Sequence, residues 1–335
     1  MLGLDIGTGR IKYVQLKQSK NLTKLVGYGN LEMPENIIVE GIISEPEKLA
    51  EMINKQLADA PWGKITAQRV VASLPESKLF TRTIEIPSVN DKDIDEAINY
   101  EIEQSIPIPA TDLYTDWQIV GESKDNYSVF LAAAPRSIID SYVQLINLMK
   151  LEPLALEVSL SAITRAIIPE KEKGLATVVI DVGARTTNMG IYQENIQIAA
   201  SAPIGAELIK ETLSSTLGVE AKEANKLLLA GIDDKSKASE IIKIELRKTL
   251  EEVDRLVKYY KEKNESKTVD QILLCGGIGS MPGMADFIEA ETGIKSRTGN
   301  PWSNISVYPI KSVPKQEASL YSAAIGLCLR GLRDE

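Results

Sequence analysis

Histidine is absent from this 335-residue sequence, and cysteine occurs only twice. Without histidine, Ser-His-Asp and Cys-His catalysis are excluded, and the imidazole ligand of most zinc sites is missing. Cys275 and Cys328 lie in the apolar segments ILLCGG and GLCLR. We expect both to be reduced core residues of a protein from a reducing compartment.

Long apolar runs and an excess of positive charge are also missing. No stretch approaches the roughly 18 apolar residues that a membrane span needs, and the chain opens directly on a predicted strand. We therefore expect neither a membrane span nor a signal peptide. The formal net charge of −9 argues against nucleic-acid binding, which requires a basic face. The length is sufficient for two or more domains with full cores.

The clearest pattern is the segment TVVIDVGARTTNMGIY, residues 177–192. A β-branched run reaches Asp181, breaks at Gly183, passes two threonines and becomes apolar again, which predicts two short strands joined by a tight turn. The backbone amides of such a turn can bind an anion, and a glycine lets a phosphate come close. A carboxylate at the end of the strand suits magnesium, bound directly or through waters.

The same pattern opens the protein. LGLDIGTGRIKYVQL, residues 2–16, again places an aspartate (Asp5) and a glycine (Gly7) between two predicted strands. The two copies lie about half a chain apart, which indicates a duplicated unit. Two such hairpins facing each other would hold one triphosphate and its metal from both sides.

A third glycine-rich turn follows a buried strand near residue 274. It contains Gly276, Gly277 and Gly279 and precedes a helix predicted to start near Pro282. Glycines between a strand and a helix N-terminus make room for a nucleotide and direct backbone donors at it.

Two further regions have recognisable patterns. Residues 77–153 predict strand, helix, strand, strand and helix, an α+β module inserted into the first half. Residues 157–167 predict a helix after this insert. Residues 239–264 predict a long helix whose buried face carries Leu246, Leu250, Val253, Val257 and Tyr260.

This order of hairpin, hairpin and glycine turn resembles actin, sugar kinases, DnaK-type chaperones and FtsA. Within that superfamily, INYEIEQSIPIPATDLYTDWQIV, FLAAAPRSIIDSYVQLINLMKLEPLALEV, GNPWSNI and YSAAIGLCLR resemble the PilM family of type IV pilus assembly. The resemblance implies an α/β fold of the duplicated, actin-like (ribonuclease H-like) ATPase kind. Its subdomains would be 1A (1–76 and 154–173), 1C (77–153), 2A (174–203 and 269–335) and 2B (204–268).

The resemblance also implies an ATP or ADP site with Mg²⁺ held by Asp5 and Asp181. The first phosphate loop would comprise Asp5, Gly7, Thr8, Gly9 and Lys12, and the second Asp181, Gly183, Ala184, Arg185, Thr186 and Thr187. The adenosine motif would comprise Gly276, Gly277, Gly279 and Met281. Gly205, Glu207 and Lys210 would flank the adenosine, in a segment that departs from the usual Gly-Gly-x-x-Leu-Thr.

Glu157 has two interpretations. It lies where related ATPases place a water-orienting residue on the connecting helix, and it is equally compatible with a solvated helix carboxylate. Because no other candidate base is at hand, we expect ATP hydrolysis to be slow or absent.

By the same resemblance, a groove between 1A and 1C would bind the cytoplasmic N-terminal peptide of a PilN-type inner-membrane protein. The protein would be a cytoplasmic scaffold at the inner face of the membrane, with pilus motor ATPases as further partners and self-association left open. The alternatives are an FtsA-like cell-division scaffold and, less favoured, a small-molecule kinase of the same fold. A kinase needs an aspartate base facing the cleft, and the candidates in the first half all lie in the insert or its turns.

Overall fold

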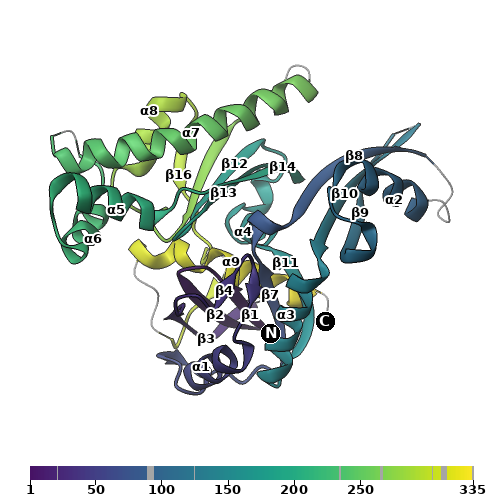
Figure 1. The fold of residues 1–335 in the computed structure, drawn as a ribbon, viewed down its shortest axis with the longest axis horizontal. Helices are drawn as coiled ribbons and strands as arrows, with labels where there is room; N and C mark the ends of the chain where they lie inside the picture. Colours follow the sequence, from purple (N-terminus) through teal and green to yellow (C-terminus); the bar gives the residue numbers. More distant parts are fainter. Residues whose placement is uncertain are drawn as a thin grey trace.

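The computed structural model describes residues 1–20, 22–88, 94–123, 125–233, 235–264, 267–303, 305–310 and 315–333. Three larger sheets carry the fold, beside a two-stranded sheet of β4 (Ile38–Val39) and β5 (Ile42–Ile43) (Figure 1). The first-half sheet has seven strands, in the order β11-β7-β1-β2-β3-β17, with β6 paired to β3. Their bounds are β1 (Leu2–Ile6), β2 (Arg10–Ser19), β3 (Leu22–Glu32), β6 (Trp62–Gly63), β7 (Arg69–Leu74), β11 (Glu152–Val158) and β17 (Ile305–Ser306).

Helices cover both faces of the first-half sheet. On one face, α1 (Pro46–Ala58) and α3 (Arg136–Leu148) bury apolar side chains such as Ile53 and Tyr142 against β1 and β7. On the other face lies α9 (Ser322–Arg333), which also contacts α4 (Ser159–Ile167). The contacts are close, because a Cβ at Gly3 would come 2.0 Å from the Ala324 carbonyl oxygen, and one at Gly326 would come 1.7 Å from that of Ala162.

The position of the C-terminal segment corrects one expected boundary. Residues 269–335 were assigned to the second half, yet β17 pairs with β3, and α9 packs on the first-half sheet. The small residues of α9 allow this close approach, which hydrophobic patterning along the chain does not reveal. Likewise, α3 was expected within the insert, but its apolar face completes the core of the first half.

The second-half sheet has five strands in the order β14-β13-β12-β15-β16. It repeats the start of the first-half sheet, since β12 pairs antiparallel with β13 and parallel with β15 as β1 does with β2 and β7. The duplicated, actin-like arrangement predicted from the two hairpins is thereby confirmed. The strands are β12 (Thr177–Val182), β13 (Thr187–Gln193), β14 (Asn195–Ala202), β15 (Gln271–Gly276) and β16 (Ser296–Thr298).

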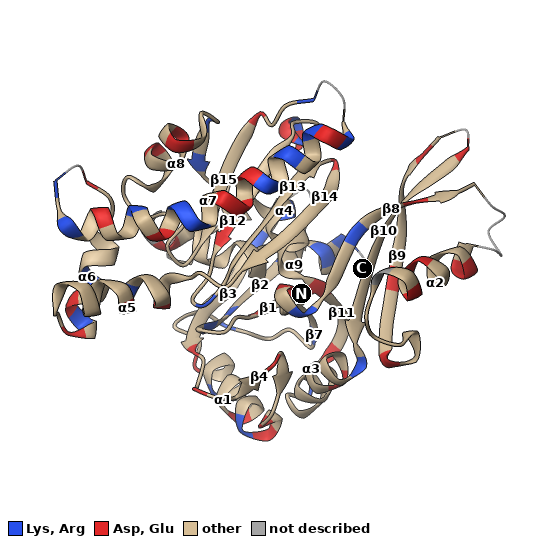
Figure 2. Ribbon diagram, turned by 45° about the horizontal axis from the view of Figure 1, so that its top comes forward, with Lys and Arg blue, Asp and Glu red and all other residues tan. Residues whose placement is uncertain are grey.

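Four helices share the core on one face of the second-half sheet. Of these, α7 (Lys237–Lys263) packs on β13 and β14 and α8 (Met284–Thr292) on β16, while α5 (Ala206–Leu217) and α6 (Ala221–Ala230) pack against α7 and against each other. The predicted long helix is confirmed in α7, and its five expected stripe residues are buried. Acidic and basic residues are interspersed along α7 (Figure 2). In the described part of the chain, no helix is long and apolar enough to span a membrane.

The third sheet is the core of the insert and has the order β8-β10-β9. Its strands are β8 (Phe80–Pro87), β9 (Leu113–Glu122) and β10 (Asn126–Pro135), and one face is covered by α2 (Ile94–Ser105) through Ile94, Ile98 and Ile102. The predicted order of strand, helix, strand, strand and helix is confirmed. We call the opposite face the open face.

The region around Glu157 differs from the prediction. Residues 157–167 were expected to form one helix, but Glu157 is the penultimate residue of β11, and α4 begins at Ser159. The parallel pairing of β11 with β7, which aligns Glu157 with Ser73, extends the strand to Val158. Long-range pairing has therefore overridden local helix propensity.

Candidate functional site

The two predicted loops lie against each other where the two halves meet, at the place of the predicted nucleotide cleft. Each is closed by the same backbone hydrogen bond, from Gly7 N to Arg10 O (3.1 Å) and from Gly183 N to Thr186 O (2.9 Å). A Cβ at Gly9 would lie 2.4 Å from the Cβ of Ala184, so only glycine lets the loops approach this closely. Segments far apart in the sequence thus form one site.

Two carboxylates lie at the base of the loops. The Asp5 Oδ2 atom is 2.6 Å from Lys12 Nζ in a largely buried ion pair, and its Oδ1 accepts a hydrogen bond from Ser73 Oγ (2.9 Å). Burial raises the pKa of Asp181 to about 6; Lys12 lowers that pKa and Asp5 raises it. The site therefore concentrates negative charge with one compensating lysine.

The third glycine turn folds over the second loop. Gly276 has φ +89°, and a Cβ there would lie 2.5 Å from Asp181 Oδ1, while Gly277 N donates to Val182 O (2.9 Å). A Cβ at Gly279 would collide with the Cys275 carbonyl. The predicted Met281 side chain is buried in the core between the second-half sheet and its helices.

The start of α5 completes the cleft. Gly205 is its N-cap, and the backbone N–H groups of Ala206 and Glu207 donate to the carbonyls of Gly183 and Ala184. Arg185 Nε donates to Glu207 Oε2 (3.0 Å). Lys210 follows one turn later on the same helix.

The threonines of the loops differ in their surroundings. The Thr187 hydroxyl donates a hydrogen bond to Ile204 O (2.7 Å), so it is already engaged within the protein. Thr8 and Thr186 lie in the turns of the first and second loops. Among the described residues, the loop amides of Ala184 and Arg185 donate to no backbone carbonyl. These amides are available to an anion.

Sequence reasoning missed two cleft residues, Ser73 and Glu76. Ser73 orients Asp5, and its Oγ also accepts from Ile6 N (2.8 Å). Glu76 is 9% exposed, and its Oε2 accepts from Leu160 N (3.3 Å) at the start of α4. Ser73 lies at the end of the predicted strand QRVVASLP and Glu76 directly follows it, and the carboxyl end of a parallel strand is the signal that could have found both.

Glu76 gives the protein a pH-dependent stability. Its pKa is raised to about 7, chiefly by burial and further by Asp181 and Glu157, whereas the Leu160 N–H lowers it. Compared with an ordinary value of 4.5, the stability that the folded state gains from holding this proton is complete below pH 4.5 and lost as the pH rises through about 7.

Replacing Glu76 by glutamine is therefore expected to flatten this dependence. Between pH 5 and 7.5, the wild type should lose about 2 kcal/mol of unfolding free energy more than Glu76→Gln does. Urea unfolding at a series of pH values measures the difference. Parallel curves for the two proteins would contradict the assignment of this proton to Glu76.

Glu157 lies at a second site. Its two carboxylate oxygens accept from Arg165 (2.6 and 2.9 Å), and Arg330 NH1 lies 3.5 Å away. Only 6% of its side chain is exposed, and Arg165 also donates to Gly326 O. The carboxylate is thus held by two arginines, and the role of orienting water stays a prediction.

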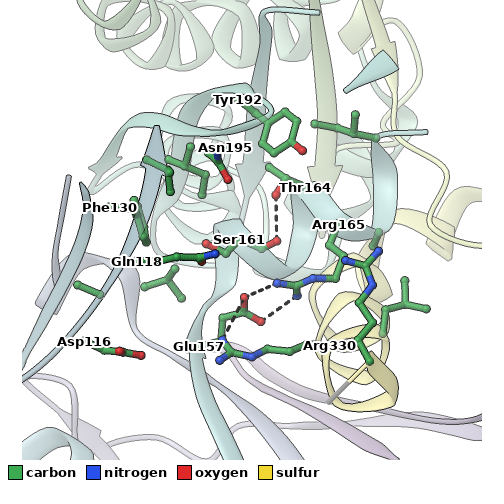
Figure 3. Close-up of a pocket in the computed structure, with 18 of the residues that line it drawn as sticks. Asp116, Gln118, Phe130, Glu157, Ser161, Thr164, Arg165, Tyr192, Asn195 and Arg330 are labelled. Atoms are coloured by element: carbon green, nitrogen blue, oxygen red, sulfur yellow. Dashed lines mark hydrogen bonds and ion pairs between the residues drawn. The ribbon is translucent and has the colours of Figure 1, made fainter. Parts of the chain in front are cut away.

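Glu157 and Arg165 belong to a large groove between the open face of the insert and the first half (Figure 3). The groove has a volume of about 1340 Å³. One wall is the open face, where the register of β9 and β10 aligns Gln118 with Phe130 and Asp116 with Ala132. The opposite wall is formed by β11, α4 and the end of α9, through Glu157, Ser161, Arg165, Arg330 and Arg333.

A family model for type IV pilus assembly protein PilM matches residues 3–332. The chain belongs to the PilM family. A solved structure of a PilM-PilN type IV pilus biogenesis complex is similar to it with a TM-score of 0.85 at 22% identity, over 99% of this chain and 98% of that one. This likeness extends over the insert as well as the two halves.

Other relatives share the fold more distantly. The cell division protein FtsA of Enterococcus hirae is 22% identical over 88% of this chain and 76% of its own length. MreB5 of Spiroplasma citri bound to ADP is similar with a TM-score of 0.57 at 10% identity, over 99% of this chain and 96% of that one. The family match therefore favours the PilM interpretation over the FtsA-like alternative.

Proposed function

We propose that the cleft binds ATP or ADP with Mg²⁺. The two facing loops and the glycine turn bring backbone segments closer together than side chains would allow, and the available amides of Ala184 and Arg185 suit phosphate oxygens. The MreB5 structure bound to ADP supports a nucleotide in a fold of this kind. In the described part of the chain, no group of three or more acidic, cysteine or histidine residues could hold a metal alone.

A magnesium site completed by phosphates fits that composition, because nucleotide-bound Mg²⁺ commonly takes only one or two carboxylates from the protein. Asp5 and Asp181 would hold the metal, and it would neutralise phosphate charge. Ser73 keeps Asp5 oriented. Lys12 forms an ion pair with Asp5 in this structure and would form one with a phosphate when the nucleotide binds. Gly205, Glu207, Lys210 and the turn Gly276–Gly279 would border the adenosine.

The groove is the observation on which the cellular function rests. We propose that it binds the extended cytoplasmic N-terminal peptide of a PilN-type inner-membrane protein. On the open-face wall, Phe130, Ala132 and Ala134 form an apolar stretch with room for anchoring side chains. Gln118 and Ser161 offer uncharged hydrogen-bonding groups to a peptide backbone. The likeness to the PilM-PilN complex supports this occupant.

On this proposal, the protein is a cytoplasmic scaffold at the inner face of the membrane, held there by its partner. The insert would act as subdomain 1C, and the remaining subdomains would follow the expected division, except that α3, β17 and α9 belong to the first half. The nucleotide would act by stabilising one arrangement of the halves and not through turnover. Pilus motor ATPases are proposed as further partners.

Titration of the purified protein with a fluorescently labelled peptide tests the proposal. The peptide is the cytoplasmic N-terminal segment of the PilN-type protein from the same organism, and a scrambled peptide is the control. We expect micromolar or tighter binding of the native peptide alone, with an affinity that differs among Mg-ATP, Mg-ADP and no nucleotide. Equal binding of both peptides, or no binding in any state, would contradict it.

A further inference from the structure

The groove has a third wall, which comes from the second half. Tyr192, Glu194, Asn195 and Ile196 line it at the turn between β13 and β14, next to the open face of the insert. Figure 3 shows Tyr192 and Asn195 above Ser161 and Thr164, on the far side of the groove from Glu157. We call residues 192–196 the second-half lip.

The lip is fastened to the second half. Gln193 Oε1 accepts from Tyr260 OH on α7 (2.7 Å) and from Lys267 Nζ (3.2 Å). Its amide nitrogen donates to Gly174 O, and Glu194, with φ +64°, donates its backbone N–H to Lys173 O (2.8 Å). The lip therefore moves with the second half and with the connection between the halves.

The lip also touches the insert directly. Thr83 Oγ1 on β8 donates to Ile196 O (3.2 Å), at the place where the edge strand β8 meets the edge strand β14. Thr83 is aligned with Phe130 in the sheet register, so this contact lies on the same open face that walls the groove. If one half shifts relative to the other, the shift reaches the groove through this contact.

The lip presents unused polar groups to the groove. Among the described residues, neither the Tyr192 hydroxyl nor the Asn195 side-chain amide takes part in a hydrogen bond, although both residues are only partly exposed. An extended peptide carries backbone N–H and C=O groups that lose water on binding and need such partners. Gln118 and Ser161 offer similar groups from the other walls.

We propose that the second-half lip is part of the peptide site, so that one peptide contacts both halves and its affinity depends on the nucleotide between them. This inference rests on the proposed function and adds two peptide-binding residues, Tyr192 and Asn195, and a contact through Thr83 that links the lip to the insert. Because a ligand can shift a conformational equilibrium only by contacting the two states differently, contact with both halves is what the nucleotide effect requires.

Three variants test the inference with the labelled PilN-type peptide, each with Mg-ATP, Mg-ADP and no nucleotide. Tyr192→Phe combined with Asn195→Ala should weaken binding about 30-fold, since each of the two lost hydrogen bonds to a desolvated group costs on the order of 1 kcal/mol. Thr83→Val should leave nucleotide-free affinity within about twofold but reduce the ratio between nucleotide states. Gln118→Ala, on the opposite wall, should weaken binding equally in all states.

The outcomes separate this inference from the function on which it rests. If the wild type does not bind the peptide, the proposed function is contradicted. If the wild type binds and the lip variant binds equally well with an unchanged nucleotide ratio, the lip inference alone is contradicted. Unchanged ATP affinity and unchanged unfolding free energy of the three variants show that any loss is local.

Discussion

A tryptophan in place of Ala132 is expected to lower the affinity for the PilN-type peptide about 100-fold, the size of a lost binding hot spot. Ala132 lies in β10, between β8 and β9, on the open face that forms one wall of the groove. It is aligned with Asp116 on β9. An indole there occupies the volume that the peptide needs. Fluorescence anisotropy with the labelled peptide measures the loss, and ATP binding should be unchanged.

The matched control is Leu229→Trp. Leu229 is 57% exposed on α6, in the second half and outside the groove. This variant should bind the peptide as the wild type does. Equal affinities for Ala132→Trp and Leu229→Trp, both folded, would mean that the peptide does not occupy this groove.

Replacing Lys12 by methionine should damage both stability and nucleotide binding. The side chains of Lys12 and Asp5 are only 13% and 9% exposed, so removal of the lysine leaves a buried carboxylate without its partner, at a cost of about 3 kcal/mol. Loss of one charge-assisted contact with phosphate should weaken ATP binding about tenfold to 100-fold. Urea unfolding and calorimetric titration with Mg-ATP measure the two effects.

The double variant Asp5→Asn with Lys12→Met separates the two effects. It removes both charges of the pair, so unfolding free energy should return close to that of the wild type while ATP binding stays weak. Full ATP affinity in either variant would contradict the assignment of this pair to the phosphate site.

The cleft could be predicted because its signals are local. Asp5 with Gly7 and Asp181 with Gly183 each fall within one strand-turn-strand segment, where the glycine requirement and the apolar alternation are read from neighbouring residues. Because this pattern occurs twice in one chain, the sequence also predicted that the two segments face each other. The distances between the loops followed only from the fold.

The features that were missed depend on partners distant in the sequence. Glu157 precedes SLSAITRAI without a break, so the local pattern favoured helix, and only the pairing of β11 with β7 makes it a strand residue. The buried side of α9 is set by Gly3 and Ala162, more than 150 residues away. Glu76 acquires its raised pKa from burial and from Asp181, neither of which its neighbours in the sequence reveal.

Hydrogen–deuterium exchange of the protein with and without the PilN-type peptide tests the central claim most directly. The account predicts slower amide exchange in β9, in α4 and in the second-half lip, because the peptide covers all three walls of the groove. Protection confined to other surfaces, such as α5 and α6, with these three segments unchanged, would contradict the groove as the partner site.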